Sequence, residues 1–96
     1  MGLKKFRAYQ LSVRFYRLCL AIRCSKHLKD QLDRASSSIS LNLSEGSAKS
    51  STRDRLKFYF IAFGSLRECQ TILELVGESE SCKSLEKQIS DTNLSR

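Results

Sequence analysis

The sequence predicts an all-α protein, an antiparallel up-down helical bundle with three long helices and a short fourth. Two observations predict this fold class. The 96 residues include no proline and only four glycines, too few for the many turns that β-sandwiches and barrels need. Apolar residues also recur at spacings of three and four along most of the chain, as they do on amphipathic helices. A chain of this length forms a single domain over residues 1–96, with a small core.

The first helix is predicted over about residues 4–24. Its apolar face consists of residues at helical spacing: Phe6, Tyr9, Val13, Tyr16 and Leu20. More apolar residues widen this face toward the end of the helix, which predicts burial on more than one side. On the opposite side, Arg7, Arg14 and Arg17 lie within about 80° of one another. Ser25 follows as a candidate N-cap for the next helix.

The second helix is predicted over about residues 26–45, because one seam steps regularly by four and three residues. That seam consists of Leu28, Leu32, Ala35, Ile39, Asn42 and Gly46. Asn42 is its polar member. It either sets the register of a buried contact or contributes to an oligomer contact, or it bonds to backbone at the loop end of the helix. Gly46 is predicted to end the helix as its C′ residue.

The third helix is predicted over about residues 52–76, between the cap candidate Ser51, with Asp54 three residues later, and Gly77. Its main seam is Tyr59, Ala62, Leu66, Cys69, Leu73 and Val76, and a second stripe holds Leu56, Phe60 and Phe63. The aromatic residues at 58–60 and 63 are expected in the core, as aromatic residues at helical spacing are in most cases, with base stacking as the alternative. Gly64 predicts close approach of another backbone, because a mid-helix glycine costs about 1 kcal/mol relative to alanine. The fourth helix, about residues 82–90, is too short to be stable unless it docks.

Charge is distributed unevenly along the chain, whose net charge is +7. Residues 1–57 hold 13 Lys/Arg against 4 Asp/Glu, whereas residues 58–96 hold 4 against 6. Such an excess on one side of a bundle favours phosphate-rich or acidic partners, although a solvated surface is the alternative interpretation. No known nucleic-acid docking motif is visible. The predicted nucleic-acid-binding residues are Lys4, Lys5, Arg7, Arg14, Arg17, Lys49, Arg53, Arg55 and Lys57.

The sequence offers no catalytic constellation, no metal site and no cofactor motif, so we predict a protein that is not an enzyme. There is one histidine, none of the four cysteines forms a C-x-x-C pair, and no glycine-rich phosphate loop occurs. Cys19 and Cys69 fall on apolar stripes, which predicts buried free thiols and a reducing, cytoplasmic environment. Neither a signal peptide nor a membrane span is predicted.

Several short motifs between residues 31 and 68 resemble, in their order, a known family. They are QLDRA at 31–35, SISLNLSEG at 38–46, STRD at 51–54 and AFGSLRE at 62–68. The stretch is similar to the bacterial four-helix bundle proteins encoded in intervening sequences of 23S ribosomal RNA genes, also called S23-type proteins. The resemblance marks a set of motif and packing residues: Asn42, Glu45, Gly46, Gly64, Ser65 and Glu68.

The resemblance implies a homo-oligomer, commonly a ring of five bundles with a basic surface. A relative in diversity-generating retroelements partners a reverse transcriptase and binds nucleic acid, whereas the family name itself reflects gene location. This chain departs from the family pattern at Ser40 in place of proline, Ser44 in place of alanine and Arg55 in place of an aromatic residue. Its fourth helix is also shorter, which implies either an open apolar groove or a neighbouring subunit that fills it.

The predicted function is therefore that of a basic, homo-oligomeric bundle that binds nucleic acid, RNA rather than DNA. The alternative is an oligomeric interaction scaffold whose basic face binds an acidic protein partner. RNA binding that weakens as the salt concentration rises would favour the first hypothesis, because neutralised phosphates release counterions.

Overall fold

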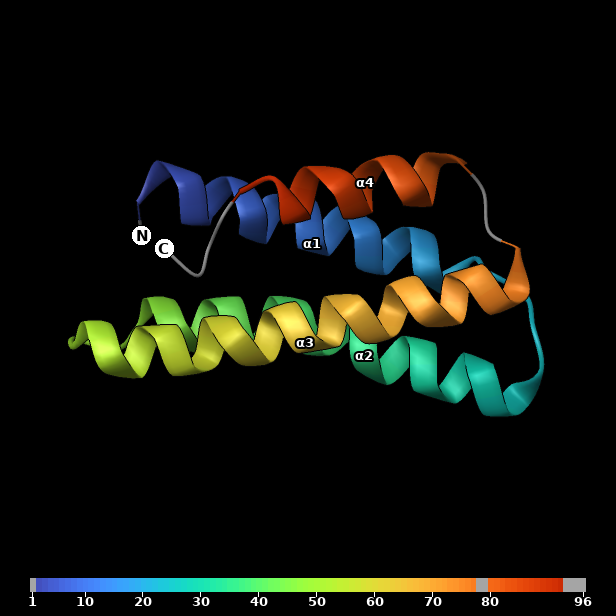
Figure 1. Cartoon of the computed structure of the whole chain (residues 1–96), viewed down its shortest axis with the longest axis horizontal. Helices are drawn as coiled ribbons and strands as arrows, with labels where there is room; N and C mark the ends of the chain where they lie inside the picture. Colours follow the sequence, from blue (N-terminus) through green and yellow to red (C-terminus); the bar gives the residue numbers. More distant parts are fainter. Residues whose placement is uncertain (1, 78–79, 93–96) are drawn as a thin grey trace.

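The computed structural model describes residues 2–77 and 80–92, apart from the side chains of Lys4 and residues 80–83. The described part forms helices α1 (Leu3–Leu20), α2 (Lys26–Ser47), α3 (Thr52–Val76) and α4 (Glu80–Ser90). They run alternately up and down along an elongated molecule of 40 × 22 × 17 Å (Figure 1). The predicted fold class, three long helices and a short fourth, is confirmed.

Three predicted helix boundaries have the expected capping residues. The Ser25 hydroxyl accepts from the Leu28 backbone N–H at 3.4 Å, and the Ser51 hydroxyl accepts from the Asp54 N–H at 3.1 Å. Each bond satisfies one N–H of a first turn that has no partner inside its helix. Gly77 ends α3 in the left-handed conformation, with φ 67°, which glycine adopts without steric cost.

The first helix ends at Leu20, four residues before the predicted end. The Lys29 ammonium group on α2 donates to the carbonyl oxygens of Cys19 and Leu20, at 2.7 and 3.1 Å. A positive charge at a helix C-terminus satisfies free carbonyls and complements the helix dipole. This tertiary contact caps the C-terminus of α1, and the residues after it connect to α2.

The second helix continues to Ser47, so the prediction that Gly46 ends it is wrong. Gly46 is buried inside the last turn of α2, facing α3. A Cβ atom at this position would lie 2.7 Å from Cε1 of Tyr59 and 3.0 Å from Cβ of Phe58. Glycine is therefore required here by the close approach of α3 and not by a turn.

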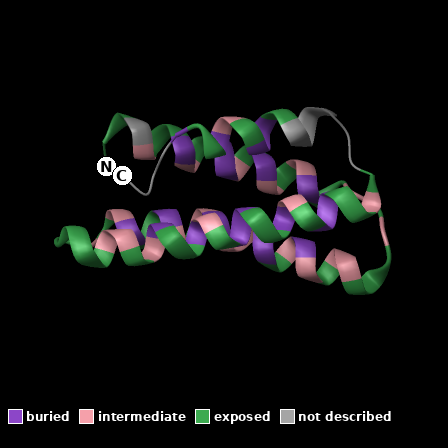
Figure 2. Ribbon diagram, in the orientation of Figure 1, coloured by how far each residue is buried: buried purple, intermediate pink, exposed green. Residues whose placement is uncertain are grey.

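The buried side of α1 also differs from the predicted one. The expected stripe from Phe6 to Leu20 is only partly buried, and these two end members are exposed. The side that packs into the bundle is turned from it by about a third of the helix circumference. Its buried residues are Ala8, Leu11, Ser12, Phe15 and Cys19. Figure 2 shows the buried residues of the helices facing one another across the bundle.

The helices do not pack equally. α2 and α3 pair along most of their lengths, α1 packs on α2 and α4, and α3 makes few contacts with α4. Because α4 has 11 residues and α3 has 25, α4 covers only part of α3. Among the described residues, the first half of α3 therefore keeps an apolar side that α4 does not cover, where Leu56 and Phe63 are half-buried and Phe60 is exposed.

Serine residues hydrogen-bond across the helix interfaces. Ser12 on α1 bonds to Ser40 on α2 at 2.8 Å, and the Ser65 hydroxyl on α3 donates to Ser38 on α2 at 2.8 Å. The Asn42 amide donates to the backbone oxygen of Ser38 at 2.8 Å. Asn42 thus bonds to backbone, as in one of its two interpretations, but within its own helix and not at the loop. These bonds satisfy polar groups that are partly removed from water.

Candidate nucleic-acid interface

The arginines of α1 form an exposed basic row. Arg7, Arg14 and Arg17 are exposed on the side of α1 that faces away from the core. With described residues they make no ion pair, since the ion pairs of this part of the chain involve other cations. The side chain of Lys4 lies outside the described part.

Two of the predicted binding residues are engaged at the α2–α3 turn. The half-buried Arg55 guanidinium donates to the carbonyl oxygens of Lys49 and Ser50, at 3.1 and 3.2 Å, and to the Thr52 hydroxyl at 3.1 Å. Lys49 forms an ion pair with Glu45 at 3.3 Å. Arg55 is therefore a structural residue of the turn, and sequence reasoning did not separate it from its exposed neighbours.

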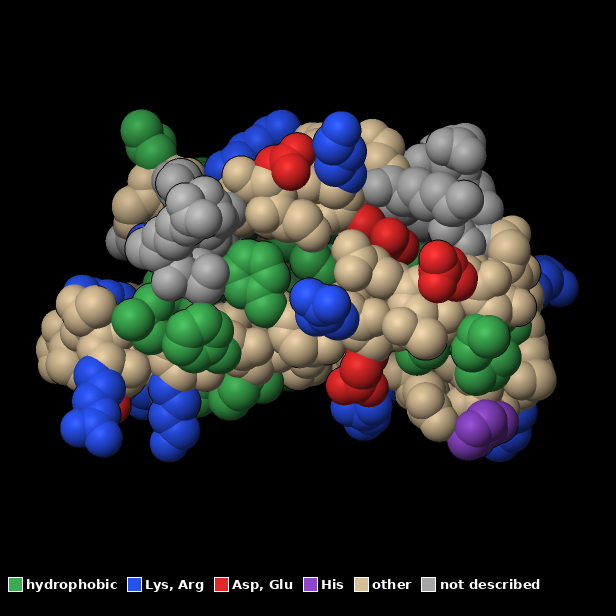
Figure 3. All heavy atoms as spheres, viewed as in Figure 1, with side chains coloured by type: hydrophobic (Ala, Val, Ile, Leu, Met, Phe, Trp, Pro, Cys, Tyr) green, Lys and Arg blue, Asp and Glu red, His purple; other side chains and the backbone are tan. Residues whose placement is uncertain are grey.

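Arg53 and Lys57 are exposed on the first turns of α3 and form no ion pair with described residues. They border an open depression of about 850 Å³, together with Ser51, Asp54, Leu56 and Phe60. Figure 3 shows Lys and Arg side chains projecting from this end of the molecule, next to a group of hydrophobic side chains. The depression thus combines two cations, one carboxylate and an exposed aromatic ring.

Lys5 on α1 lies at the same end of the molecule as the first turns of α3. Its ammonium group lies 5.7 Å from the centroid of the Tyr59 ring, which places the start of α1 beside the first half of α3. Arg17 lies twelve residues further along α1, or about 18 Å at 1.5 Å per residue. The fold therefore gathers Lys5, Arg53 and Lys57 at one end and extends the basic row of α1 away from it.

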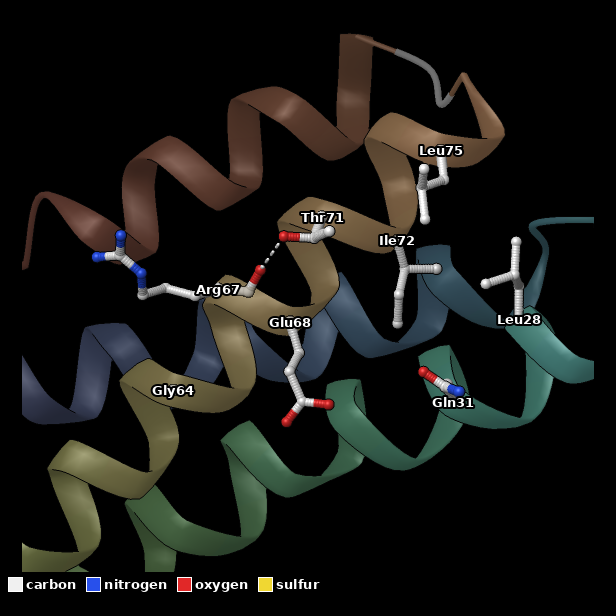
Figure 4. Close-up of a pocket in the computed structure, with 8 residues that line it drawn as sticks. All are labelled: Leu28, Gln31, Gly64, Arg67, Glu68, Thr71, Ile72 and Leu75. Carbon is white, nitrogen blue, oxygen red and sulfur yellow. Dashed lines mark hydrogen bonds between the residues drawn. The ribbon is translucent and has the colours of Figure 1, made fainter.

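A second hollow, of about 430 Å³, lies between α2 and α3 and holds mixed charges (Figure 4). Glu68 reaches toward α2, where it pairs with Arg34 at 2.7 Å, whereas Arg67 points away from the hollow. Leu28, Ile72 and Leu75 supply its apolar wall at the far end. Because Arg34 is already paired with Glu68 and Arg67 points away, this hollow is a weaker candidate for polyanions than the basic end.

The buried thiol of Cys69 is held protonated. Burial raises its pKa well above the ordinary value, and Cys19 and the carboxylates of Glu68 and Glu86 raise it further. A protonated thiol is a poor nucleophile and a poor metal ligand. In the part of the chain that the structure describes, no group of His, Cys, Asp and Glu residues could hold a metal ion. None of the helices in that part is long and apolar enough to cross a membrane.

The family comparison agrees with these features of the fold. A model of the family described as 23S rRNA-intervening sequence protein matches residues 5–94. The chain belongs to this family. A search of curated proteins found no match.

Several motif residues of the family join α2 to α3. Ser65 bonds across the interface, Glu68 pairs with Arg34, and Gly46 admits the Tyr59 ring. Gly64 differs, because no atom of another described element lies within 4 Å of where its Cβ would be. The prediction that Gly64 allows close packing is therefore wrong within the single chain, where it lines the second hollow.

Sequence reasoning missed the exposure of Phe60, which it placed in an apolar stripe with Leu56 and Phe63. The signal was present, because Phe60 follows Arg53 by seven residues and Lys57 by three and so shares their side of the helix. An aromatic residue that is aligned with two cations belongs to the surface as readily as to the core.

Proposed function

We propose that this chain is a non-enzymatic protein that binds nucleic acid, RNA rather than DNA, through its basic surface. The observation that carries the proposal is a set of exposed cations with no carboxylate partner among the described residues: Arg7, Arg14, Arg17, Arg53 and Lys57. Unpaired cations attract phosphates and release their counterions, and such binding needs no sequence motif.

Neutralising Arg53 and Lys57 together to glutamine is expected to weaken binding of a labelled RNA hairpin about tenfold. Because each lost phosphate contact removes about 0.7–0.9 from the slope of log affinity against log salt, the slope should fall by about 1.4–1.8. Fluorescence anisotropy over a salt series measures both quantities, and a DNA hairpin of the same length tests the preference for RNA.

The matched control is Lys26→Gln, which removes an exposed lysine that is already paired with Asp30 at 2.9 Å. This variant should leave affinity and salt slope within twofold of the parent chain. Affinity for RNA that does not change with salt would contradict the proposal.

We further propose that the protein works as a homo-oligomer, in which α2 and α3 contribute the contact surface. The support is an exposed apolar pair, Leu41 on α2 and Ile61 on α3. Leu41 follows Arg34 by seven residues, and Ile61 precedes Glu68 by seven. Arg34 and Glu68 form an ion pair between the two helices. Residues seven apart share a helix face, so the two apolar side chains lie on the same outer side of the antiparallel α2–α3 pair.

Light scattering is expected to give a mass that is a multiple of the 11.0 kDa chain. Leu41→Glu should reduce this mass, because a charge in a contact between subunits is desolvated without a partner. The control Leu3→Glu alters an exposed leucine at the start of α1 and should leave the mass unchanged. A parent chain that scatters as a monomer at all concentrations would overturn self-association without affecting RNA binding.

A further inference from the structure

The strongest unexplained feature of the surface is Phe60, a large aromatic side chain that is 57 % exposed in the middle of a long helix. Its neighbours on the same side, Leu56 and Phe63, are half-buried, so Phe60 stands at the edge of an apolar surface. α4 does not cover this part of α3, because the two helices make few contacts. No described helix therefore closes off the ring, and its exposed part can meet a ligand.

The two residues before Phe60 are also aromatic, and each of their rings already has a cation beside it. Lys49 lies 5.2 Å from the centroid of the Phe58 ring, and Lys5 lies 5.7 Å from that of Tyr59. Such contacts engage the ring through its quadrupole. Among the described residues, no cation lies over the Phe60 ring, so that part of the chain offers it no comparable partner.

The charges around Phe60 favour an anionic ligand. Arg53 and Lys57 border the same depression, and neither forms an ion pair with a described carboxylate. Asp54 is the carboxylate of the lining and follows the N-cap of α3, where the helix dipole favours a negative charge. The volume of about 850 Å³ lies within the range of small-ligand sites, about 300–1,000 Å³.

An aromatic ring beside two cations suits a nucleotide that is not base-paired. Its phosphates can reach the cations while the face of its base stacks on the ring. The bases of a duplex are already stacked on one another and offer no free face. An apolar segment of another protein would be served as well by leucine as by phenylalanine, and it would not require the two cations.

We propose that the Phe60 depression binds an unpaired nucleotide, with the base stacked on Phe60 and the phosphates at Arg53 and Lys57. The chain then prefers single-stranded RNA, or an RNA loop, to a duplex of equal charge. This inference rests on the proposed nucleic-acid binding and adds to it the class of ligand that the basic end selects.

The test compares an oligouridine of about 12 nucleotides with an RNA duplex carrying the same number of phosphates. Phe60→Leu is expected to weaken binding of the single strand about 5- to 150-fold, the effect of one lost stacking contact, and to change duplex binding less than twofold. Phe60→Tyr keeps a ring and should retain parent affinity. Phe6→Leu removes a phenylalanine of similar exposure, 48 %, outside the depression and should change neither.

A covalent probe locates the contact directly. An oligouridine with a photoactivatable uracil should crosslink to the tryptic peptide of residues 58–67, which lies between cleavage after Lys57 and after Arg67. The crosslink should be lost in Phe60→Leu. Thermal unfolding by circular dichroism confirms that each variant is folded, and light scattering confirms that its mass is unchanged.

The outcomes separate this inference from the proposed function. Salt-dependent binding that Phe60→Leu leaves unchanged would overturn the stacking and keep the basic surface. A parent chain that binds neither RNA would overturn both. A drop in mass in Phe60→Leu, without a change in RNA affinity, would assign the depression to a contact between subunits and so overturn the inference.

Discussion

Replacing Phe15 by alanine is expected to lower the free energy of unfolding by about 3–5 kcal/mol. Phe15 is 0 % exposed and is the largest of the fully buried side chains. It projects from α1 into the core that α1 shares with α2 and α4. The loss combines the transfer of the ring from the core to water with the cavity left behind. For a chain of this length, total stability is about 5–14 kcal/mol, so the variant loses about a fifth or more of it.

Urea unfolding followed by circular dichroism measures the effect as a lower midpoint at an unchanged slope. Phe6→Ala is the matched control, since the same substitution on the same helix removes a half-exposed ring and should cost less than about 1 kcal/mol. Equal losses in the two variants would show that the face of α1 that carries Phe15 is not the one that packs.

The same substitution at two glycines is expected to have opposite effects. Gly46→Ala should destabilise the fold by about 1–3 kcal/mol, because the new methyl group overlaps Tyr59, which is only 2 % exposed and has little room to move. Gly64→Ala should stabilise it by about 1 kcal/mol, since nothing lies within 4 Å and alanine favours helix. The two variants therefore differ by about 2–4 kcal/mol.

Thermal and urea unfolding of the two variants, measured beside the parent chain, test this difference. A double variant, Gly46→Ala with Tyr59→Leu, serves as the control, because a smaller side chain at position 59 relieves the overlap. In that background Gly46→Ala should cost less. Destabilisation by Gly64→Ala at low protein concentration would contradict the expected gain in the single chain.

The local sequence determined where the helices lie. The bounds of α3, 52–76, follow from Ser51, Gly77 and the seam between them, and the structure has the same bounds. α2 begins at the predicted residue after Ser25. These boundaries depend on backbone groups that find partners within a turn or two, or on a glycine conformation, so local residues decide them.

The contacts between helices decided the features that sequence reasoning placed wrongly. The apolar side of α1 is broad. The helical spacing of its apolar residues shows that they share a side, but it does not show which part of that side meets another helix. The ammonium group of Lys29, ten residues beyond Cys19, caps the C-terminus of α1 by donating to the Cys19 carbonyl oxygen. Gly46 reads locally as a helix end, whereas Tyr59, thirteen residues later, makes it an interior residue.

The candidate interface divides in the same way. Charge can be counted along the chain, so the sequence predicted that the first half is basic. It predicted Arg53, Arg55 and Lys57 alike as binding residues, because all three are cations in that half. Only the folded α2–α3 turn separates Arg55, which bonds to carbonyl groups, from its two exposed neighbours. By itself the sequence determined the helices, the excess of positive charge and the family motifs. The tertiary structure decided which cations stay unpaired among the described residues. It also left Phe60 exposed beside two of them, because the short α4 covers only part of α3.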